Sequence, residues 1–263
     1  MASKIVTLTS DFGLKDPYVA EMKAAFLGIC PSAVLVDVTH DVEKFNVREG
    51  AFMLASAAPY FPRGTIHLAV IDPSVGSQRR PIIIETKHSL FVGPDNGLLM
   101  LAAETQGITR FFEITSRRLM LSHVSRTFHG RDIFAPAAAH LANGTPLEEF
   151  GPQITDVFKP QFAKVTRTHD LLVGEVLHVD DFGNIITNIH GKEIEAFRDS
   201  LVQVELSARK EPMKVSNTYS DVKLFDPMVV VGSHNYAEIA LNQGNAALKF
   251  QVKAGDKITL MKI

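Results

Sequence analysis

The stretch KIVTLTSDFG, residues 4–13, decides the class of fold. Its first six residues form a β-branched run typical of a buried strand, and the run ends at the polar turn Ser10–Gly13. Apolar residues then recur at helical spacing from Tyr18 to Ile29, and Pro31 ends that pattern. This part of the chain is therefore predicted to be a strand, a loop and a helix in succession.

The same alternation continues through the first half of the chain. Strands that alternate with helices of this length predict right-handed crossovers and a mostly parallel sheet. In such folds ligands bind beyond the carboxyl ends of the strands. Asp11 and Asp72 each follow a predicted strand end, and Asp37 with His40 follows another. The further predicted strands are 33–38, 65–71, 82–85 and 90–92, and the further helices are 47–58, 98–104 and 133–141.

The second half of the chain has a different character. Residues 156–170 contain Pro, Lys and Thr without a clear period, so we predict a domain boundary there, with an α/β domain at 1–165 and a second domain at 166–263. Short β-like runs separated by turn residues follow, which favours an antiparallel sheet or a small β-barrel. These runs are 172–179, 185–189, 201–206, 228–231, 237–241 and 257–261.

Composition limits the partners that we expect. The 263 residues include 27 Lys and Arg against 29 Asp and Glu, a net charge of -2, so no basic field is present to hold nucleic acid. The apolar run 51–61 is much shorter than the roughly 20 residues of a membrane span. The N-terminus resembles no export signal, and the single cysteine, Cys30, cannot form an intrachain disulfide. We expect a soluble, cytoplasmic protein without a nucleic-acid or membrane partner.

Two segments gather polar residues where a parallel sheet would expose them. Asp72 stands at a strand end, and Arg79 and Arg80 follow across a turn, so that one arginine could fold back over the carboxylate. The alternative is an ordinary loop salt bridge. The segment Phe128–Asp132 precedes a helix, where backbone N–H groups can stabilise an anion. Alternatively, Asp132 is a first-turn acid and His129 a loop histidine with satisfied hydrogen bonds.

Two further segments allow two interpretations each. Asp11 could bind the two hydroxyls of a ribose or could cap the next helix. The segment Asp181–Asn184 could be a β-turn with an Asx contact, or a ring and an amide that bind a base. Glycine-rich nucleotide fingerprints, the kinase motif set, a Gly-x-Ser-x-Gly elbow and a His-Glu-x-x-His helix are all absent from the sequence.

Six short motifs, each weak alone, occur together and in register. They are TSDFG (9–13), DVTH (37–40), IDPSVG (71–76), GPDNGLL (93–99), FHGRDIFAP (128–136) and DFGNIITNI (181–189). Together they span nearly the whole chain. The sequence resembles the S-adenosylmethionine hydroxide adenosyltransferase family, whose relatives include the fluorinase and the chlorinase.

The resemblance implies an architecture and a reaction. It implies an N-terminal α/β domain, a C-terminal β-barrel and a homotrimer with active sites between subunits. Members of the family cleave S-adenosylmethionine with water to adenosine and L-methionine, with neither a cofactor nor a metal. The catalytic trio carried over is Asp72, Arg79 and His129, although the adjacent Arg80 leaves the identity of the arginine open.

The resemblance also implies substrate-binding positions. Asp11 matches the ribose-binding acid, Phe45 a ring near the adenosine, and Phe182 with Asn184 the adenine contacts. Asp16 and Ser233 match positions near the methionine end, and Asn245 and Ala246 are further substrate-binding positions.

The chain departs from the halogenating relatives at several places. Those relatives lack the trio, carry a serine at the position of Gly130 and have an insertion that is missing between Glu85 and Ser89. The chain therefore resembles the water-using branch. His234 stands where the halogenating relatives have an arginine near the methionine carboxylate, which leaves the methionine end less well matched.

The expected chemistry suits these residues. The sulfonium departs as a neutral thioether, so that only the water nucleophile needs activation. His129 with Asp72 can accept its proton, in an order that the sequence leaves open, while Arg79 favours a hydroxide-like oxygen. Two alternatives remain at this point. One is a metal-assisted hydrolase whose metal is bound by Asp11, Asp72, His129 and Asp132, and the other is a non-catalytic sensor of adenosine or S-adenosylmethionine.

Overall fold

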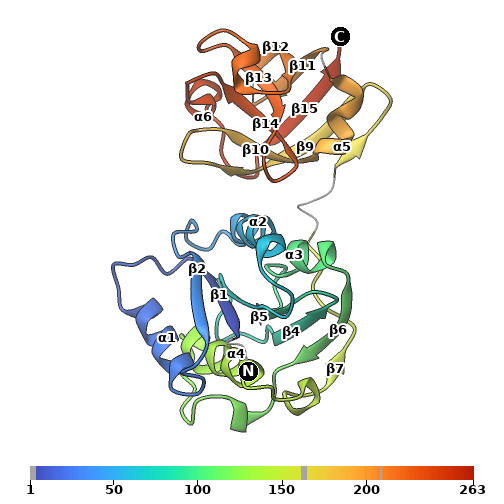
Figure 1. Ribbon diagram of the computed structural model, residues 1–263. Coiled ribbons are helices and arrows are strands. Elements are labelled where there is room, and N and C mark those ends of the chain that lie inside the picture. The colour runs from blue at the N-terminus through green and yellow to red at the C-terminus, as the bar shows by residue number, and fades with distance from the viewer. Residues whose placement is uncertain (1–3, 161–164, 199, 208) are drawn as a thin grey trace. The chain divides into compact units, whose positions relative to one another are not determined.

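The computed structural model describes residues 4–160, 165–198, 200–207 and 209–263. The chain divides into two compact units, residues 1–160 and 161–263, which Figure 1 shows in blue to green and in yellow to red. Residues 161–164, inside the predicted boundary segment, lie outside the described residues. Within the described ranges, no helix is both long enough and apolar enough to cross a membrane.

The N-terminal unit is built on one sheet, whose described strands run in the order β2-β1-β3-β5-β4-β6-β7. The strands from β2 to β5 in this order are parallel, and those from β5 to β7 are antiparallel. A short turn joins β4 to β5, and a turn of that length can connect only antiparallel strands. The α/β prediction is confirmed, although β6 and β7 were not predicted. The strands are β1 Ile5–Ser10, β2 Val34–Thr39, β3 Ile66–Val70, β4 Pro81–Thr86, β5 Leu90–Pro94, β6 Ile108–Glu113 and β7 Gln153–Ile154.

Helices cover both faces of this sheet. Helices α1 (Tyr18–Leu27) and α4 (Ala135–Ala142) pack on one face, and α2 (Val47–Ala57) and α3 (Met100–Thr105) pack on the other (Figure 1). The alternation of side chains along each strand supplies both cores, because successive residues point to opposite faces. In β4, for example, Ile83 joins the core with α1 and α4, whereas Ile82 and Ile84 join the core with α2 and α3.

The C-terminal unit is a closed β-barrel. Its described strands run in the order β10-β14-β13-β12-β11-β15-β9, and pairing of β9 with β10 closes the ring, with β8 added at the edge. The pair β12–β13 is parallel, and the other pairs are antiparallel. The strands are β8 Thr166–Arg167, β9 Leu171–Val179, β10 Ile185–His190, β11 Leu201–Leu206, β12 Arg209–Ser216, β13 Pro227–Val231, β14 Tyr236–Leu241 and β15 Lys257–Lys262, and the helices are α5 Gly191–Ile194 and α6 Ala246–Phe250.

The barrel confirms the expectation of a small β-barrel and the six predicted β runs. Strand β12 was not predicted, because its first half is polar and contains Pro212. A signal for it was present in Met213 and Val215, which alternate along the strand and are buried in the barrel core.

Candidate active site

A cavity of about 300 Å³ opens at the carboxyl ends of β1 and β3 in the N-terminal unit. Five residues predicted from the sequence line it, namely Asp11, Asp16, Phe45, Asp72 and His129. The other lining residues are Phe12, Tyr18, Lys44, Val70, Val75, Thr127, Phe128 and Gly130. The fold therefore gathers side chains from four separate sequence segments around one space.

Asp11 is held by the segment that follows β2. The backbone N–H of Phe45 donates to Asp11 Oδ2 at 2.9 Å, and the Lys44 ammonium group donates to the Asp11 carbonyl oxygen. Phe45 has a φ of 67°, an uncommon conformation for a residue other than glycine, and its ring is 70% exposed. The alternative that Asp11 caps the next helix is wrong, because α1 begins at Tyr18 after Pro17 and has no side-chain cap.

A turn after β3 folds Arg79 back over Asp72. Gly76 has a φ of +78°, and a Cβ atom there would collide with the carbonyl oxygen of Arg126, so the turn requires glycine. Arg79 Nε lies 3.0 Å from Asp72 Oδ1 and 2.8 Å from Oδ2, and Arg79 Nη2 also donates to Oδ2. The two side chains are only 5% and 7% exposed, so this ion pair is buried.

Arg80 has different partners. Its guanidinium contacts Asp95 at 2.8 Å and Asp156 at 3.0 Å, and 25% of its side chain is exposed. Of the two adjacent arginines, Arg79 is therefore the one that reaches Asp72. Arg80 instead pairs with carboxylates from two other segments, at Asp95 and Asp156.

Arg79 also contacts His129. Its Nη2 lies 2.7 Å from His129 Nδ1, and its guanidinium lies over the Phe134 ring, 5.2 Å from the ring centre. A guanidinium can only donate hydrogen bonds, so Nδ1 must accept and the neutral ring must carry its proton on Nε2. Burial and the positive charge of Arg79 both lower the pKa of His129, which favours this neutral form.

The loop and helix start that carry His129 are held by Asp132. The segment Gly130–Phe134 forms a π-helical turn, after which α4 begins at Ala135, a few residues later than predicted. Asp132 is fully buried and accepts from the Ser125 N–H at 2.8 Å and from Arg131 Nε at 2.7 Å. Its carboxylate therefore orders the loop before α4.

The alternative of a metal-assisted hydrolase requires a cluster of metal-binding side chains. In the described part of the chain, no group of three or more His, Cys, Asp or Glu side chains could hold a metal ion. Of the four residues suggested for such a site, Asp72 is paired with Arg79, and Asp132 with Arg131.

Aromatic residues that the sequence reasoning did not assign to the site also surround the cavity. The rings of Phe12, Tyr18 and Phe128 meet edge to face, with centres 5.3 to 6.3 Å apart. A Cβ atom on Gly130 would lie 3.2 Å from Phe12 Cζ, so this wall leaves little room for a side chain there. Phe12 belongs to the TSDFG motif and Phe128 to FHGRDIFAP, whereas Tyr18 carries only the apolar spacing of the predicted helix.

In the barrel, the turn before β10 lies against the start of α6. Asn184 donates from its backbone N–H and its side-chain amide to the two carboxylate oxygens of Asp180, at 2.8 and 2.9 Å. The carboxylate that makes the Asx contact in this turn is therefore that of Asp180. Gly183 lies directly against the Asn245 side chain, with no room for a Cβ atom, and this brings Phe182 and Asn184 close to Asn245 and Ala246. The Phe182 ring is 80% exposed.

Ser233 belongs to a different connection of the barrel. It is exposed and belongs to the connection between β13 and β14.

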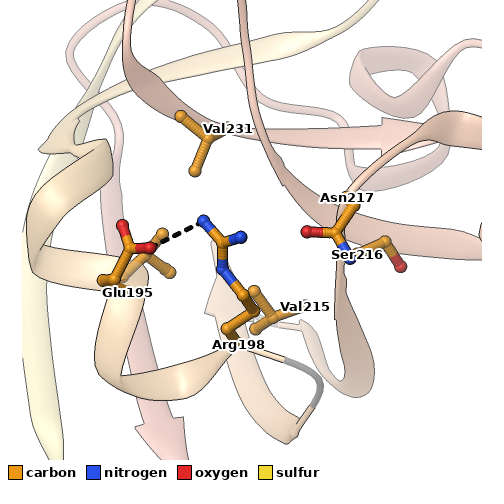
Figure 2. Close-up of a pocket in the computed structure, with 7 residues that line it drawn as sticks. Glu195, Arg198, Val215, Ser216, Asn217 and Val231 are labelled. Atoms are coloured by element: carbon orange, nitrogen blue, oxygen red, sulfur yellow. Dashed lines mark ion pairs between the residues drawn. The ribbon is translucent and has the colours of Figure 1, made fainter.

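A second cavity, of about 180 Å³, lies in the barrel unit (Figure 2). The Arg198 guanidinium lies 2.7 Å from the Glu195 carboxylate, and both side chains are more than half exposed. A dashed line marks this ion pair in Figure 2. None of the residues predicted from the sequence lines this cavity, whose lining residues are Ile194, Glu195, Arg198, Val215, Ser216, Asn217 and Val231. Arg198 and Glu195 neutralise each other in this ion pair, and we assign no function to the cavity.

Fold and site together define a class of protein. It is a two-unit chain in which an α/β domain precedes a closed β-barrel, with a buried Asp-Arg pair and an adjoining histidine beside a cavity at the strand ends. The sequence matches the SAM hydroxide adenosyltransferase N-terminal domain over residues 6–151 and the corresponding C-terminal domain over residues 174–259. The chain belongs to the SAM hydroxide adenosyltransferase family.

Individual relatives match over nearly the full length. A Salinispora tropica protein named (R)-S-adenosyl-L-methionine hydrolase is 40% identical over 256 residues, covering 96% of each chain. A fluorinase of Actinoplanes sp. is 28% identical over 290 residues, covering 98% of this chain and 97% of the fluorinase. The crystal structure of an uncharacterized conserved protein from Thermotoga maritima has a TM-score of 0.92 and 39% identity, covering 98% of this chain and 100% of that one.

Proposed function

We propose that this protein hydrolyses S-adenosyl-L-methionine to adenosine and L-methionine. The observation that carries the proposal is the Arg79 side chain, which contacts Asp72 and His129 together at the wall of the cavity. The full-length similarity to proteins named (R)-S-adenosyl-L-methionine hydrolase supports the same reaction. The oxygen of water attacks the ribose 5′ carbon, the carbon–sulfur bond breaks with its electron pair on sulfur, and one proton leaves the water.

In this proposal His129 donates a hydrogen bond and Asp72 takes the proton. With Nδ1 accepting from Arg79, the neutral ring offers only the Nε2–H, which can hold the water oxygen but cannot accept its proton. Asp72 lines the cavity, and its carboxylate, which is paired with Arg79, is the acceptor. Arg79 does not line the cavity and acts through the other two by fixing their positions.

The remaining site residues bind the substrate in the same proposal. Asp11 binds the ribose hydroxyls, Phe45 covers the adenosine, and Asp16 with Ser233 lies near the methionine end. Phe182, Asn184, Asn245 and Ala246 bind the adenine. The cavity is lined by the carboxylates of Asp11, Asp16 and Asp72 and by the ammonium group of Lys44, which donates to the Asp11 carbonyl oxygen. This predominance of negative groups suits a substrate that carries a sulfonium and an ammonium group.

We propose a homotrimer with active sites at subunit interfaces, in the cytoplasm. The Phe45 and Phe182 rings are 70% and 80% exposed, and a neighbouring subunit would remove such rings from water. A free, buried Cys30 is compatible with a reducing compartment. Sedimentation of the purified protein measures the oligomeric state directly.

The test is hydrolysis in water enriched in heavy oxygen. We expect adenosine labelled at its 5′ oxygen and unlabelled methionine, in an assay that persists after exhaustive chelation. Adenosine without label above background would refute the attack of water at the 5′ carbon. Calorimetric binding of S-adenosylmethionine without turnover would instead indicate a sensor.

Substitution of the histidine tests its assigned role. His129→Ala removes the Nε2–H donor, and we expect kcat to fall about 10²- to 10³-fold, as for the loss of one donor in a preorganised site. The exposed His123→Ala is the matched control and should leave kcat unchanged. An unchanged kcat in His129→Ala would remove this side chain from the mechanism.

A further inference from the structure

The DVTH motif at the end of β2 has no role in the proposed reaction, yet its side chains form a continuous chain of contacts. His40 Nδ1 lies 2.7 Å from Ser10 Oγ, and His40 Nε2 lies 3.1 Å from Asp37 Oδ1. Lys23 Nζ of helix α1 lies 2.6 Å from the other carboxylate oxygen of Asp37. The contacts lead from the protein surface at Asp37 to the buried end of β1.

Burial excludes a nucleophilic role for this Ser-His-Asp group. Ser10 is completely buried and His40 is 4% exposed, and neither lines a cavity described above. Ser10 Oγ accepts a hydrogen bond from the Phe12 N–H at 3.3 Å and also lies within hydrogen-bond distance of His40 Nδ1. On its other side the ring faces Asp37, with Nε2 3.1 Å from Oδ1, so the imidazole lies between the Ser10 hydroxyl and the Asp37 carboxylate.

The group holds the turn that contains Asp11. Ser10 and Phe12 flank Asp11 and are joined through the Ser10 hydroxyl, and the Gly13 N–H donates to the His40 carbonyl oxygen at 2.7 Å. Residues 10–13 are thus attached to His40 at both ends, by its side chain and by its backbone. The Asp11 carboxylate between these attachments lines the cavity.

We propose that His40 is a positioning residue for Asp11: the contacts Asp37–His40–Ser10 hold the turn at residues 10–13 so that the Asp11 carboxylate meets the ribose hydroxyls of the substrate. The inference rests on the proposed function, because it assigns Asp11 to the ribose. Loss of the imidazole removes the contact between Ser10 Oγ and His40, and with it the side-chain attachment of the turn to β2. Displacement of Asp11 then weakens ribose binding, whereas Asp72 and His129 keep their contacts with Arg79.

The test compares variants and substrates. For His40→Ala we expect KM for S-adenosylmethionine to rise about tenfold with little change in kcat, the pattern of lost ground-state binding. With the 2′-deoxy analogue of the substrate, the same substitution should change KM less than about twofold. This analogue lacks one of the two ribose hydroxyls that Asp11 binds, so the position of Asp11 matters less. In the Asp11→Ala background, His40→Ala should add nothing, since the two residues act as one unit.

Controls separate positioning from general stability. His40→Asn keeps a polar group near the position of Nδ1 and should restore KM to within about threefold of the wild type. Ser10→Ala, which removes only the hydroxyl, should repeat the His40→Ala effect and serves if His40→Ala does not fold. The matched control is His88→Ala, an exposed histidine in the turn between β4 and β5, and it should leave KM unchanged.

Two outcomes overturn the inference. One is an unchanged KM in a folded His40→Ala or Ser10→Ala variant, and the other is an equal rise in KM with the 2′-deoxy analogue. If the wild type releases no adenosine from S-adenosylmethionine, the proposed function fails separately. Calorimetry with adenosine, which carries the same ribose, then decides: weaker binding by His40→Ala supports the positioning role, and unchanged binding refutes it.

Discussion

Two adjacent arginines with different partners permit a matched experiment on the centre of the site. Arg79→Lys keeps the positive charge but replaces a planar fork of donors by a single ammonium group. Arg79 makes three contacts with Asp72 and one with His129. The lysine side chain is shorter and ends in a single nitrogen, so it cannot contact Asp72 and His129 in the same way. Arg80→Lys makes the same chemical change one residue away, where the partners are Asp95 and Asp156.

The expected magnitudes follow from the geometry. Without the Arg79 fork, the orientations of Asp72 and His129 are no longer fixed, and a misplacement of about 1 Å costs roughly 10²-fold in rate. We therefore expect kcat of Arg79→Lys to fall about 10²-fold, and kcat of Arg80→Lys to stay within about threefold, because partly exposed ion pairs contribute little. Stability adds a second contrast. Arg79→Met leaves the Asp72 carboxylate, 5% exposed, without its cation, which should cost about 3–5 kcal/mol of unfolding free energy.

The assays are adenosine release, followed by chromatography across a range of S-adenosylmethionine concentrations, and urea unfolding of each variant. The companion variant Asp72→Asn with Arg79→Met removes the unpaired charge and should recover part of the lost stability. Equal losses of kcat in Arg79→Lys and Arg80→Lys would refute the assignment of Arg79, and so would full activity of Arg79→Lys.

Two further predictions concern pH. Burial and the charge of Arg79 lower the pKa of His129, so its ring stays neutral as pH falls. We therefore expect kcat to decline only below the ordinary histidine pKa of about 6.5. A pH–rate profile with an acidic midpoint at or above that value contradicts the prediction. His67 is fully buried, with Nδ1 2.8 Å from Thr7 Oγ1 and its ring stacked on Phe91, and burial lowers its pKa to about 4. As pH falls from the unfolded-state pKa of about 6.5 towards 4, the unfolded chain takes up this proton first, so the folded state should lose about 3 kcal/mol relative to His67→Phe over that window. Urea unfolding at several pH values measures the difference, and parallel pH profiles for the two proteins would disprove it.

Local patterns predicted most of the elements because burial on a sheet or helix leaves a periodic signal. The β-branched run that became β1 and the helical spacing that became α1 are of this kind. Strands β6 and β12 were missed because half or more of their residues keep contact with solvent, so polar residues interrupt the pattern. Strand β6 also pairs with β4 and β7, which other elements separate from it in the sequence, and periodicity does not report such pairing.

The candidate site was predicted from motifs in register, and its geometry was not. Asp11 and Asp72 meet at one cavity because they follow the carboxyl ends of the neighbouring strands β1 and β3, whereas His129 reaches that cavity from the segment before α4. The cap interpretation of Asp11 was reasonable from spacing alone, since an acid shortly before a helix often caps it. It is wrong because the chain continues to Tyr18 before the helix begins, and the carboxylate finds the Phe45 N–H instead.

The sequence by itself determined the α/β and barrel classes, the family and the residues from which the site is drawn, because these depend on residue types and their order. Only the tertiary structure decided which arginine pairs with Asp72 and which nitrogen of His129 carries the proton. It also decided that the His40 side chain contacts Ser10, the residue before Asp11. The physical reason is that hydrogen bonds are directional and short. Whether Arg79 or Arg80 reaches a carboxylate depends on the left-handed turn at Gly76 and on the Phe134 ring under the guanidinium, contacts between segments that no local pattern contains.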